Sequence, residues 1–337
     1  MGVDLRDLVI KHPIEIADLK GKKIAIDAFN TLYQFISIIR QPDGAPLMDS
    51  QGHITSHLSG LFYRTANLLA AGIQPCFAFD GRAPEEKKAM QEEREKIRES
   101  AREKFKEAQA AGEIEKARLY AQQTARLTTS MIQESKELLN AMGLPWVQAL
   151  AEGEAQAAAM AIRGHVWAVA SQDYDTLLFG SPRLIRNLSI SGRKKVPNKK
   201  TYMEVKPEII DLAESLNFLG MDIEALVRIA LLIGTDYNPK GVEGIGPKTA
   251  LKVVREGKFE DYADKIPNWK SLKSIFLKPA ITTDYTLSWT EPNIDKIKEI
   301  LVTRHNFAEE RVDSTLGKLA KLKDAKNQKG INDFFSF

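Results

Sequence analysis

The sequence has very little cysteine: Cys76 is the only one among 337 residues. A lone cysteine cannot form an internal disulfide bond, and scarce cysteine is typical of a reducing compartment. Long apolar runs are also missing, and none approaches the roughly 20 residues of a membrane span. The first ten residues include Asp4 and Asp7 and no long apolar segment, so we expect no secretory signal. These absences predict a chain of the cytoplasm or nucleoid with no membrane partner.

The chain also lacks a strong excess of charge of one sign. Its 48 Lys and Arg residues against 45 Asp and Glu give a net charge of +3. Whole-chain charge therefore does not indicate nucleic-acid binding, and any basic surface must come from local clustering. Hydrophobic residues make up 43% of the sequence, which suffices for a sizeable core in one large domain or two.

Three short apolar runs share one pattern: each ends in an acid. They are "KKIAID" (22–27), "QPCFAFD" (74–80) and "VWAVASQD" (166–173). Helical patterns such as 56–71 and 130–142 lie between them. Alternating strands and helices predict an α/β fold with a mainly parallel central sheet flanked by helices. Ligands of such sheets bind beyond the carboxyl ends of the strands, so we expect the acids to converge there.

The remaining segments differ in composition. Residues 84–128 are very polar with a thin apolar stripe, which fits either a solvated helix or a helical excursion over the strand ends. Residues 182–206 have the pattern of a β-hairpin with a basic tip. Residues 221–254 predict a helix, a glycine-rich turn and a second helix. Residues 318–330 are rich in lysine and predict a flexible linker.

Seven acids border apolar or small-residue runs. Any single one is most simply a cap or turn residue, but two acid-x-acid pairs and three further acids are hard to explain as caps. Two carboxylates about 4 Å apart repel by roughly 4 kcal/mol at an effective dielectric of about 20, so a cluster must take up protons or divalent cations. With no His or Cys beside them, these oxygen donors favour Mg²⁺ or Mn²⁺, and two such ions can promote phosphodiester hydrolysis. The acids are Asp27, Asp80, Glu152, Glu154, Asp173, Asp175 and Asp236.

Basic and aromatic residues at helical spacing accompany these acids. Lys87 and Arg94 are seven apart and share one helix face. They could hold a scissile phosphate, or they could be an ordinary solvated pair. Tyr33 and Arg40 are also seven apart, and Tyr33 could stack on a base or pack in the core.

Two further motifs suggest binding. The turn "GVEGIGPKTALKVV" (241–254) puts Pro247 at a helix start, where free amides and Lys248 could hold a phosphate, although it could simply be a tight turn. The terminal "QKGINDFF" spaces apolar residues to dock into a partner's groove, unless the tail folds back on its own core.

Across essentially the whole chain, several motifs together resemble flap endonucleases of the archaeal and eukaryotic type, in the structure-specific 5′-nuclease superfamily. The motifs are "IAIDAFNTLYQF", "TSHLSGLFYRT", "FAFDGRAPEEKK", "AEGEAQAA", "SQDYDTLLFG", "LLIGTDYNPKGVEGIGPKTA" and "QKGINDFF".

The resemblance implies a PIN-like 5′-nuclease fold in a single core, 1–325. This core includes a helical arch (84–130) and a DNA-binding helix–two-turn–helix element (221–256). A flexible tail, 326–337, would bind the sliding clamp (PCNA). The implied activity is hydrolysis at the base of 5′ flaps in Okazaki-fragment maturation and DNA repair, with associated 5′→3′ exonuclease activity. The implied cofactors are two Mg²⁺ ions, replaceable by Mn²⁺, and a K⁺ ion at the helix–two-turn–helix. We expect a monomer.

The resemblance also assigns roles to individual residues. The seven acids become the metal ligands, and the catalytic set comprises Lys87, Arg94 and Gly2. The expected DNA contacts are Tyr33, Arg40, Thr55, Glu152, Gly234, Asp236, Gly244, Gly246, Lys248 and Thr249. The expected clamp contacts are Gln328, Ile331, Phe334 and Phe335.

Two rival functions remain open: a 5′→3′ exonuclease acting at gaps and nicks, and a non-catalytic, clamp-tethered DNA-binding protein. The chain stops at Phe337 without the basic extension of eukaryotic members, which predicts an archaeal type with no nuclear address. The segment 255–315 reads as mixed helix and predicts no chemistry of its own.

Overall fold

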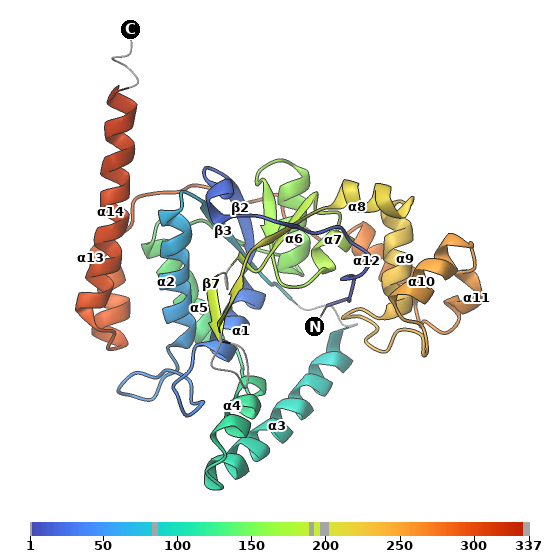
Figure 1. Ribbon diagram of the computed structural model, residues 1–337, viewed down its shortest axis with the longest axis horizontal. Helices are drawn as coiled ribbons and strands as arrows, with labels where there is room; N and C mark the ends of the chain where they lie inside the picture. The colour runs from blue at the N-terminus through green and yellow to red at the C-terminus, as the bar shows by residue number, and fades with distance from the viewer. Residues whose placement is uncertain (1, 83–86, 189–191, 196–201, 333–337) are drawn as a thin grey trace.

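The computed structural model describes residues 2–82, 87–188, 192–195 and 202–332, arranged around a seven-stranded sheet (Figure 1). The strand order is β1-β9-β6-β5-β2-β3-β4. β4, β3, β2, β5 and β6 run parallel, while β9 is antiparallel to β6 and β1 antiparallel to β9. The predicted α/β fold with a mainly parallel sheet is thus confirmed. The strands are β1 (His12–Pro13), β2 (Lys23–Asp27), β3 (Gln74–Phe79), β4 (Trp146–Gln148), β5 (Ala168–Ala170), β6 (Arg183–Arg186) and β9 (Glu208–Asp211).

Alternation of side chains along the central strand β2 divides the core into two layers. Ile24 and Ile26 pack with α1 (Ala28–Ile38), α2 (Ser56–Ala70) and α5 (Thr129–Ala141) on one face. Ala25 points to the opposite face and packs with α6 (Gly153–Ile162). Successive side chains of a strand point to opposite faces, so a sheet covered on both sides needs an apolar residue at every position. The all-apolar stretch from Ile24 to Ile26 meets this demand.

A separate helical layer packs against one end of the sheet through α7 (Asp175–Leu178). Its members are α8 (Leu212–Leu219), α9 (Ile223–Ile233), α10 (Pro247–Arg255), α11 (Glu260–Ala263) and α12 (Trp269–Leu277). Asp222 caps α9 by accepting from the Ala225 amide, and Pro247 occupies the first turn of α10. The helix, turn and helix predicted over 221–254 are therefore α9, its following loop and α10.

The polar segment that begins at 84 forms a helical hairpin wherever it is described. α3 (Lys88–Ala110) and α4 (Ile114–Gln123) project from the body of the molecule (Figure 1). Small buried alanines allow the two helices to lie close together, whereas the larger apolar side chain of Ile97 on α3 is 54% exposed. Gly112 makes the turn between the helices with a φ of +71°, which glycine adopts without strain. The buried alanines are Ala101, Ala108, Ala117 and Ala121.

Two local predictions differ from the structure. Within 182–206, β6 joins the main sheet because Leu184 and Ile185 are fully buried there. A separate ribbon of β7 (Gly192–Lys195) and β8 (Tyr202–Val205) forms the hairpin, and its tip lies outside the described residues. The linker predicted over 318–330 is instead helical, as the last part of α14 (Glu309–Asn332). Lysine, alanine and leucine favour helix even without apolar burial.

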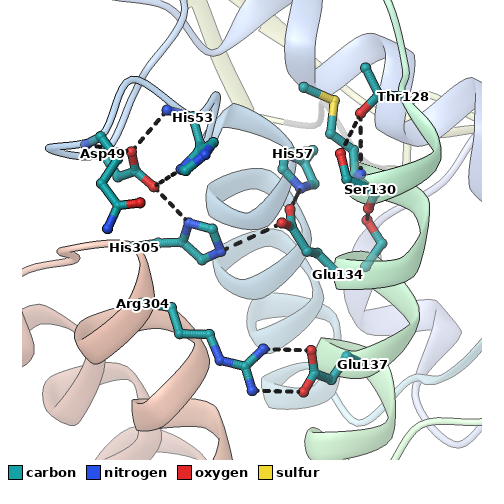
Figure 2. A network of polar contacts seen from close by, with 12 residues as sticks. Asp49, His53, His57, Thr128, Ser130, Glu134, Glu137, Arg304 and His305 are labelled. Carbon is teal, nitrogen blue, oxygen red and sulfur yellow. Dashed lines mark hydrogen bonds and ion pairs between the residues drawn. The ribbon is translucent and has the colours of Figure 1, made fainter.

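A polar network joins the loop before α2, and α2 itself, to neighbouring helices (Figure 2). The buried Asp49 carboxylate accepts from the His53 and Gln51 amides and lies 3.0 Å from His305 Nδ1. His305 follows η4 (Glu299–Arg304), which continues from α13 (Ile294–Lys298). His57 of α2 is buried and lies 3.1 Å from Glu134 of α5. In the part of the chain the structure describes, no helix is long and apolar enough to cross a membrane.

Candidate active site

Three of the acids stand where neighbouring parallel strands end. Asp27 is the last residue of β2 and caps α1, accepting from the Asn30 amide at 3.1 Å. Asp80 directly follows β3 and accepts from the Gly153 amide at 2.7 Å. Asp173 comes three residues after β5. Because β2 is parallel to both β3 and β5, these carboxylates meet at one edge of the sheet, as the strand pattern predicts.

The other four acids belong to helix ends beside that edge. Glu152 occupies the position before α6, and Glu154 lies in its first turn, where the helix dipole favours negative charge. Asp175 is the first residue of α7. Asp236 follows α9 in the loop that Gly234 opens with a φ of +115°. Two layers of the protein therefore supply acids to the same place.

Six of the seven acids line one open pocket of about 310 Å³, which we call the acidic pocket. Three further residues that the sequence analysis singled out line it as well. The seventh, Asp175, lies behind the pocket with its side chain buried and accepts from the Val3 amide at 2.7 Å. Predicted residues in the pocket wall are Asp27, Asp80, Glu152, Glu154, Asp173, Asp236, Lys87, Arg94 and Tyr33.

The N-terminal segment closes over this buried acid. A Cβ atom added to Gly2 would lie 2.5 Å from Asp175 Oδ1 and 3.0 Å from the Cβ of Asp173. No side chain fits into that space, so glycine lets the backbone reach the two acids. Gly2, which the resemblance places in the catalytic set, therefore lies beside the acids.

Two cations at the start of the helical hairpin reach into the acids. Lys87 Nζ forms an ion pair with Glu152 and lies 3.7 Å from Asp236. Arg94 Nη2 donates to both oxygens of Asp236, at 3.0 and 3.2 Å. The Glu152 and Asp236 charges outweigh burial and raise the pKa of Lys87, so this lysine stays protonated. The hairpin thereby places positive charge at one end of an acidic pocket.

Burial and mutual repulsion make the acids unusually basic. Burial, then the charge of Asp80, raises the pKa of Asp27 to about 8. Burial is also the main cause that raises the pKa of Asp175 to about 7 and of Asp80 to about 6. Burial and the charge of Asp27 raise the pKa of Glu154 well above its usual range. At neutral pH the cluster therefore lacks the positive charge that would neutralise all of its carboxylates.

This shortage suits hard divalent cations. The donors are carboxylate oxygens, the ligand type that Mg²⁺ and Mn²⁺ prefer. Among the described side chains, no three acids, histidines or cysteines stand as a ready-made metal site. Lys87 and Arg94 contact two of the acids instead. The carboxylate ligands and their raised pKa values fit a pair of divalent ions. Lys87 and Arg94 neutralise part of the negative charge that such ions would neutralise.

Three polar residues of the site were not singled out by the sequence analysis, although Asn30 and Ser171 lie within motifs that it quoted. Asn30 Nδ2 donates to Asp173 at 2.9 Å, and Ser171 Oγ donates to Glu154 at 2.8 Å. Arg98 lines the pocket, with its guanidinium 5.8 Å from the Tyr33 ring centroid. Arg98 lies four residues after Arg94, so helical spacing could have identified it. Asn30 and Ser171 gave no comparable signal.

The expected DNA contacts lie in four places. Tyr33 lines the acidic pocket, whereas Arg40 is half-buried and donates to the carbonyls of Ser37 and Gly44. Thr55 is buried at the start of α2. The turn after α9 and the first residues of α10 are exposed at Gly244, Gly246, Lys248 and Thr249.

The expected clamp contacts lie at the end of the chain. Gln328 and Ile331 belong to the last turns of α14, and Figure 1 shows this end of the helix projecting from the body. Phe334 and Phe335 lie outside the described residues.

Comparison with known proteins identifies the family. The XPG N-terminal domain matches residues 1–101, and the XPG I-region matches residues 143–236. Flap endonuclease 1 of Staphylothermus marinus is 54% identical over 332 residues, which is 95% of each chain.

Solved structures agree. Flap endonuclease-1 from Methanococcus jannaschii superposes with a TM-score of 0.77 at 42% identity, covering 96% of this chain and all of that one. The catalytic core of Rad2 in complex with DNA substrate gives 0.68 at 25% identity, covering 95% of this chain and all of that one. The chain belongs to the flap endonuclease 1 family.

Proposed function

We propose that the protein hydrolyses the phosphodiester at the base of 5′ flaps in branched DNA. The observation that carries the proposal is the acidic pocket, with Lys87 and Arg94 placed at its edge. Family membership supplies the substrate class. As in the roles implied by the sequence, we place the activity in Okazaki-fragment maturation and DNA repair, in the cytoplasm or nucleoid.

Each group in the pocket has a distinct role in this reaction. Lys87 and Arg94 bind the scissile phosphate and offset charge that develops on its oxygens. Tyr33 stacks on the base beside that phosphate, and Asn30 and Ser171 orient carboxylates by hydrogen bonds. Two bound divalent ions, Mg²⁺ with Mn²⁺ as a substitute, would supply an activated water and neutralise the leaving oxygen. The residues that would hold them are Asp27, Asp80, Glu152, Glu154, Asp173, Asp175 and Asp236.

Asp173→Ala tests the acidic pocket directly. Removing a carboxylate that would hold a divalent ion is expected to slow cleavage of a labelled 5′-flap duplex in Mg²⁺ by about a hundredfold or more. Asp284→Ala is the matched control, because Asp284 is exposed and does not line the pocket. Equal cutting by Asp173→Ala and wild type would contradict the assignment of the acids.

The two rival functions are separated by substrate. An enzyme specialised for gaps and nicks would degrade a gapped duplex faster than it cuts a flap, whereas we expect flap cleavage to be faster and exonuclease activity to accompany it. A non-catalytic DNA-binding protein would show no turnover with any divalent ion. Clustered acids disfavour a purely phosphate-binding role, since they repel the DNA backbone.

Binding outside the pocket completes the proposal. The exposed turn and start of α10, including Lys248, would hold the backbone of the duplex, with a K⁺ ion at the carbonyls of the turn. The tail residues Gln328, Ile331, Phe334 and Phe335 would dock on the sliding clamp, and the nuclease would act as a monomer.

Changing Phe334→Ala and Phe335→Ala together tests the tail. Loss of two aromatic anchors is expected to abolish binding to the clamp, measured by gel filtration or surface plasmon resonance. Basal flap cleavage without the clamp should stay at the wild-type rate. Loss of basal cleavage as well would place the tail in the nuclease core.

A further inference from the structure

A second pocket lies on the other side of Glu152 from the acidic pocket. We call it the α12 pocket; its volume is about 240 Å³, and Glu152, Phe179, Tyr237, Ser274 and Lys278 are among the residues that line it. Glu152 is common to both pockets, and none of the other acids lines this one. The roles given above to the seven acids therefore leave the α12 pocket unexplained.

The wall of the α12 pocket is aromatic and firmly supported. Tyr237 and Phe179 line it, and both are more than 90% buried. Each ring packs against Phe276 of α12, with centroids 5.4 and 5.1 Å apart, respectively. Ser271 and Ser274, three residues apart on α12, place hydroxyl groups at the exposed side. The result is a rigid apolar surface with polar groups at its rim, which suits a flat ring with polar edges.

Lys87 connects the two pockets. Its Nζ contacts Glu152 and Asp236 in the acidic pocket and also lies 5.0 Å from the centroid of the Tyr237 ring. Tyr33 lines the acidic pocket, and Tyr237 lines the α12 pocket. A strand whose phosphate lies at Lys87 thus has an aromatic side chain available in each pocket.

We propose that the α12 pocket binds the nucleobase of the nucleotide on the 5′ side of the scissile phosphate, the first nucleotide of the flap. The volume holds one base with its sugar, the aromatic wall stacks without regard to sequence, and Lys278 meets the next phosphate of the flap. This inference rests on the proposed flap cleavage. It predicts that the flap leaves the acidic pocket past Lys87 and Tyr237.

Fluorescence of 2-aminopurine in the flap tests the pocket. The full chain carrying Asp173→Ala binds a flap duplex with 2-aminopurine at the first flap position, or at the third as a control. Stacking in the pocket should quench the first-position probe at least twofold. Adding Ser274→Trp, which fills the pocket from an exposed position, should remove this quenching. Ser314→Trp, at an exposed position of α14, should leave it unchanged.

Cleavage kinetics provide the second readout. An abasic first flap nucleotide should lower kcat/KM of the wild type about tenfold, while the Ser274→Trp variant should not distinguish abasic from normal flaps. Quenching that survives Ser274→Trp, or an abasic flap cut as fast as a normal one, would overturn the proposal. A wild type that cuts no flap at all would instead refute the proposed function, and the fluorescence result would still report on the pocket.

Discussion

At the scale of single residues, Gly2 shows how tightly the backbone packs against Asp175 and Asp173. Gly2 has no room for a Cβ atom, which would lie 2.5 Å from Asp175 Oδ1. Gly2→Ala must therefore displace either the N-terminal backbone or the Asp175 and Asp173 side chains. A displacement of about 1 Å can cost up to about a hundredfold in rate. We expect Gly2→Ala to lower kcat for flap cleavage strongly, measured at saturating DNA.

Gly317→Ala is the matched control for that change. Gly317 lies within α14, and a Cβ atom there would meet nothing within 4 Å. Alanine is the better helix former, by up to about 1 kcal/mol, so this variant should be as active as wild type and slightly more stable. If both alanine variants kept full activity, the contact between Gly2 and the acids would have no catalytic role.

Residue patterns predict much of the site because strand topology is simple. Parallel strands end at one edge, so the acids that end the runs 22–27, 74–80 and 166–173 were expected to meet there. Asn30 and Ser171 were missed because short polar residues are common and their partners, Asp173 and Glu154, lie far away or on another element. Only the folded chain shows which polar group meets which.

At the scale of elements, the loop before α2 depends on one buried carboxylate. Asp49 accepts from two backbone amides, and its Oδ2 lies 3.1 Å from His53 Nδ1 and 3.0 Å from His305 Nδ1 (Figure 2). Hydrogen bonds from these neighbours hold the pKa of Asp49 well below its usual range, although burial alone would raise it. The charged carboxylate thus joins the loop to the end of η4.

Asp49→Asn should loosen this loop. The amide is nearly isosteric, but its NH₂ group cannot accept from the histidines, so the buried His305 and the exposed His53 lose an acceptor. We expect the Tm, measured by circular dichroism, to fall by several degrees. Asp43→Asn in the same loop is the control, since Asp43 is exposed and the amide oxygen can still accept from the Ala45 amide. Equal Tm values for the two variants would contradict the structural role of Asp49.

The elements also show where sequence patterns lose information. The apolar run around Leu184 and Ile185 fits a hairpin strand and a sheet strand equally well. Its place between β5 and β9 depends on residues 208–211, which follow the ribbon. In α14, lysine-rich composition does not distinguish a polar helix from a linker. For β6, local composition predicts burial, whereas pairing with distant strands decides which sheet the strand joins.

At the scale of the whole molecule, folding brings together acids that the unfolded chain keeps apart. Asp27 and Asp236 are more than 200 residues apart in sequence and line one pocket. Burial and the charges of neighbouring acids raise the pKa of Asp27 to about 8 and that of Asp175 to about 7. The protein therefore tolerates a repulsion that stabilises nothing by itself, which is understandable if bound cations relieve it.

The repulsion between the buried acids predicts how the stability of the metal-free protein changes with pH. A carboxyl whose folded pKa lies above its unfolded value binds more protons in the folded state, so stability falls as pH rises toward the folded pKa. Burial lowers the pKa of His57, which acts in the opposite direction, but this effect largely ends about one pH unit above the unfolded pKa of about 6.5. Between pH 7 and 8.5 the acids should therefore dominate, and the Tm in EDTA should decrease.

Mg²⁺ should reverse this trend, because ions that bind the ionised acids stabilise only the folded state. We expect the Tm gain from saturating Mg²⁺ to be larger at pH 8 than at pH 7, as measured by scanning calorimetry. Asp27→Asn removes the acid with a pKa of about 8 and should flatten the metal-free decline. A metal-free Tm that rises over this range in the wild type would show that the acids do not repel one another as their burial requires.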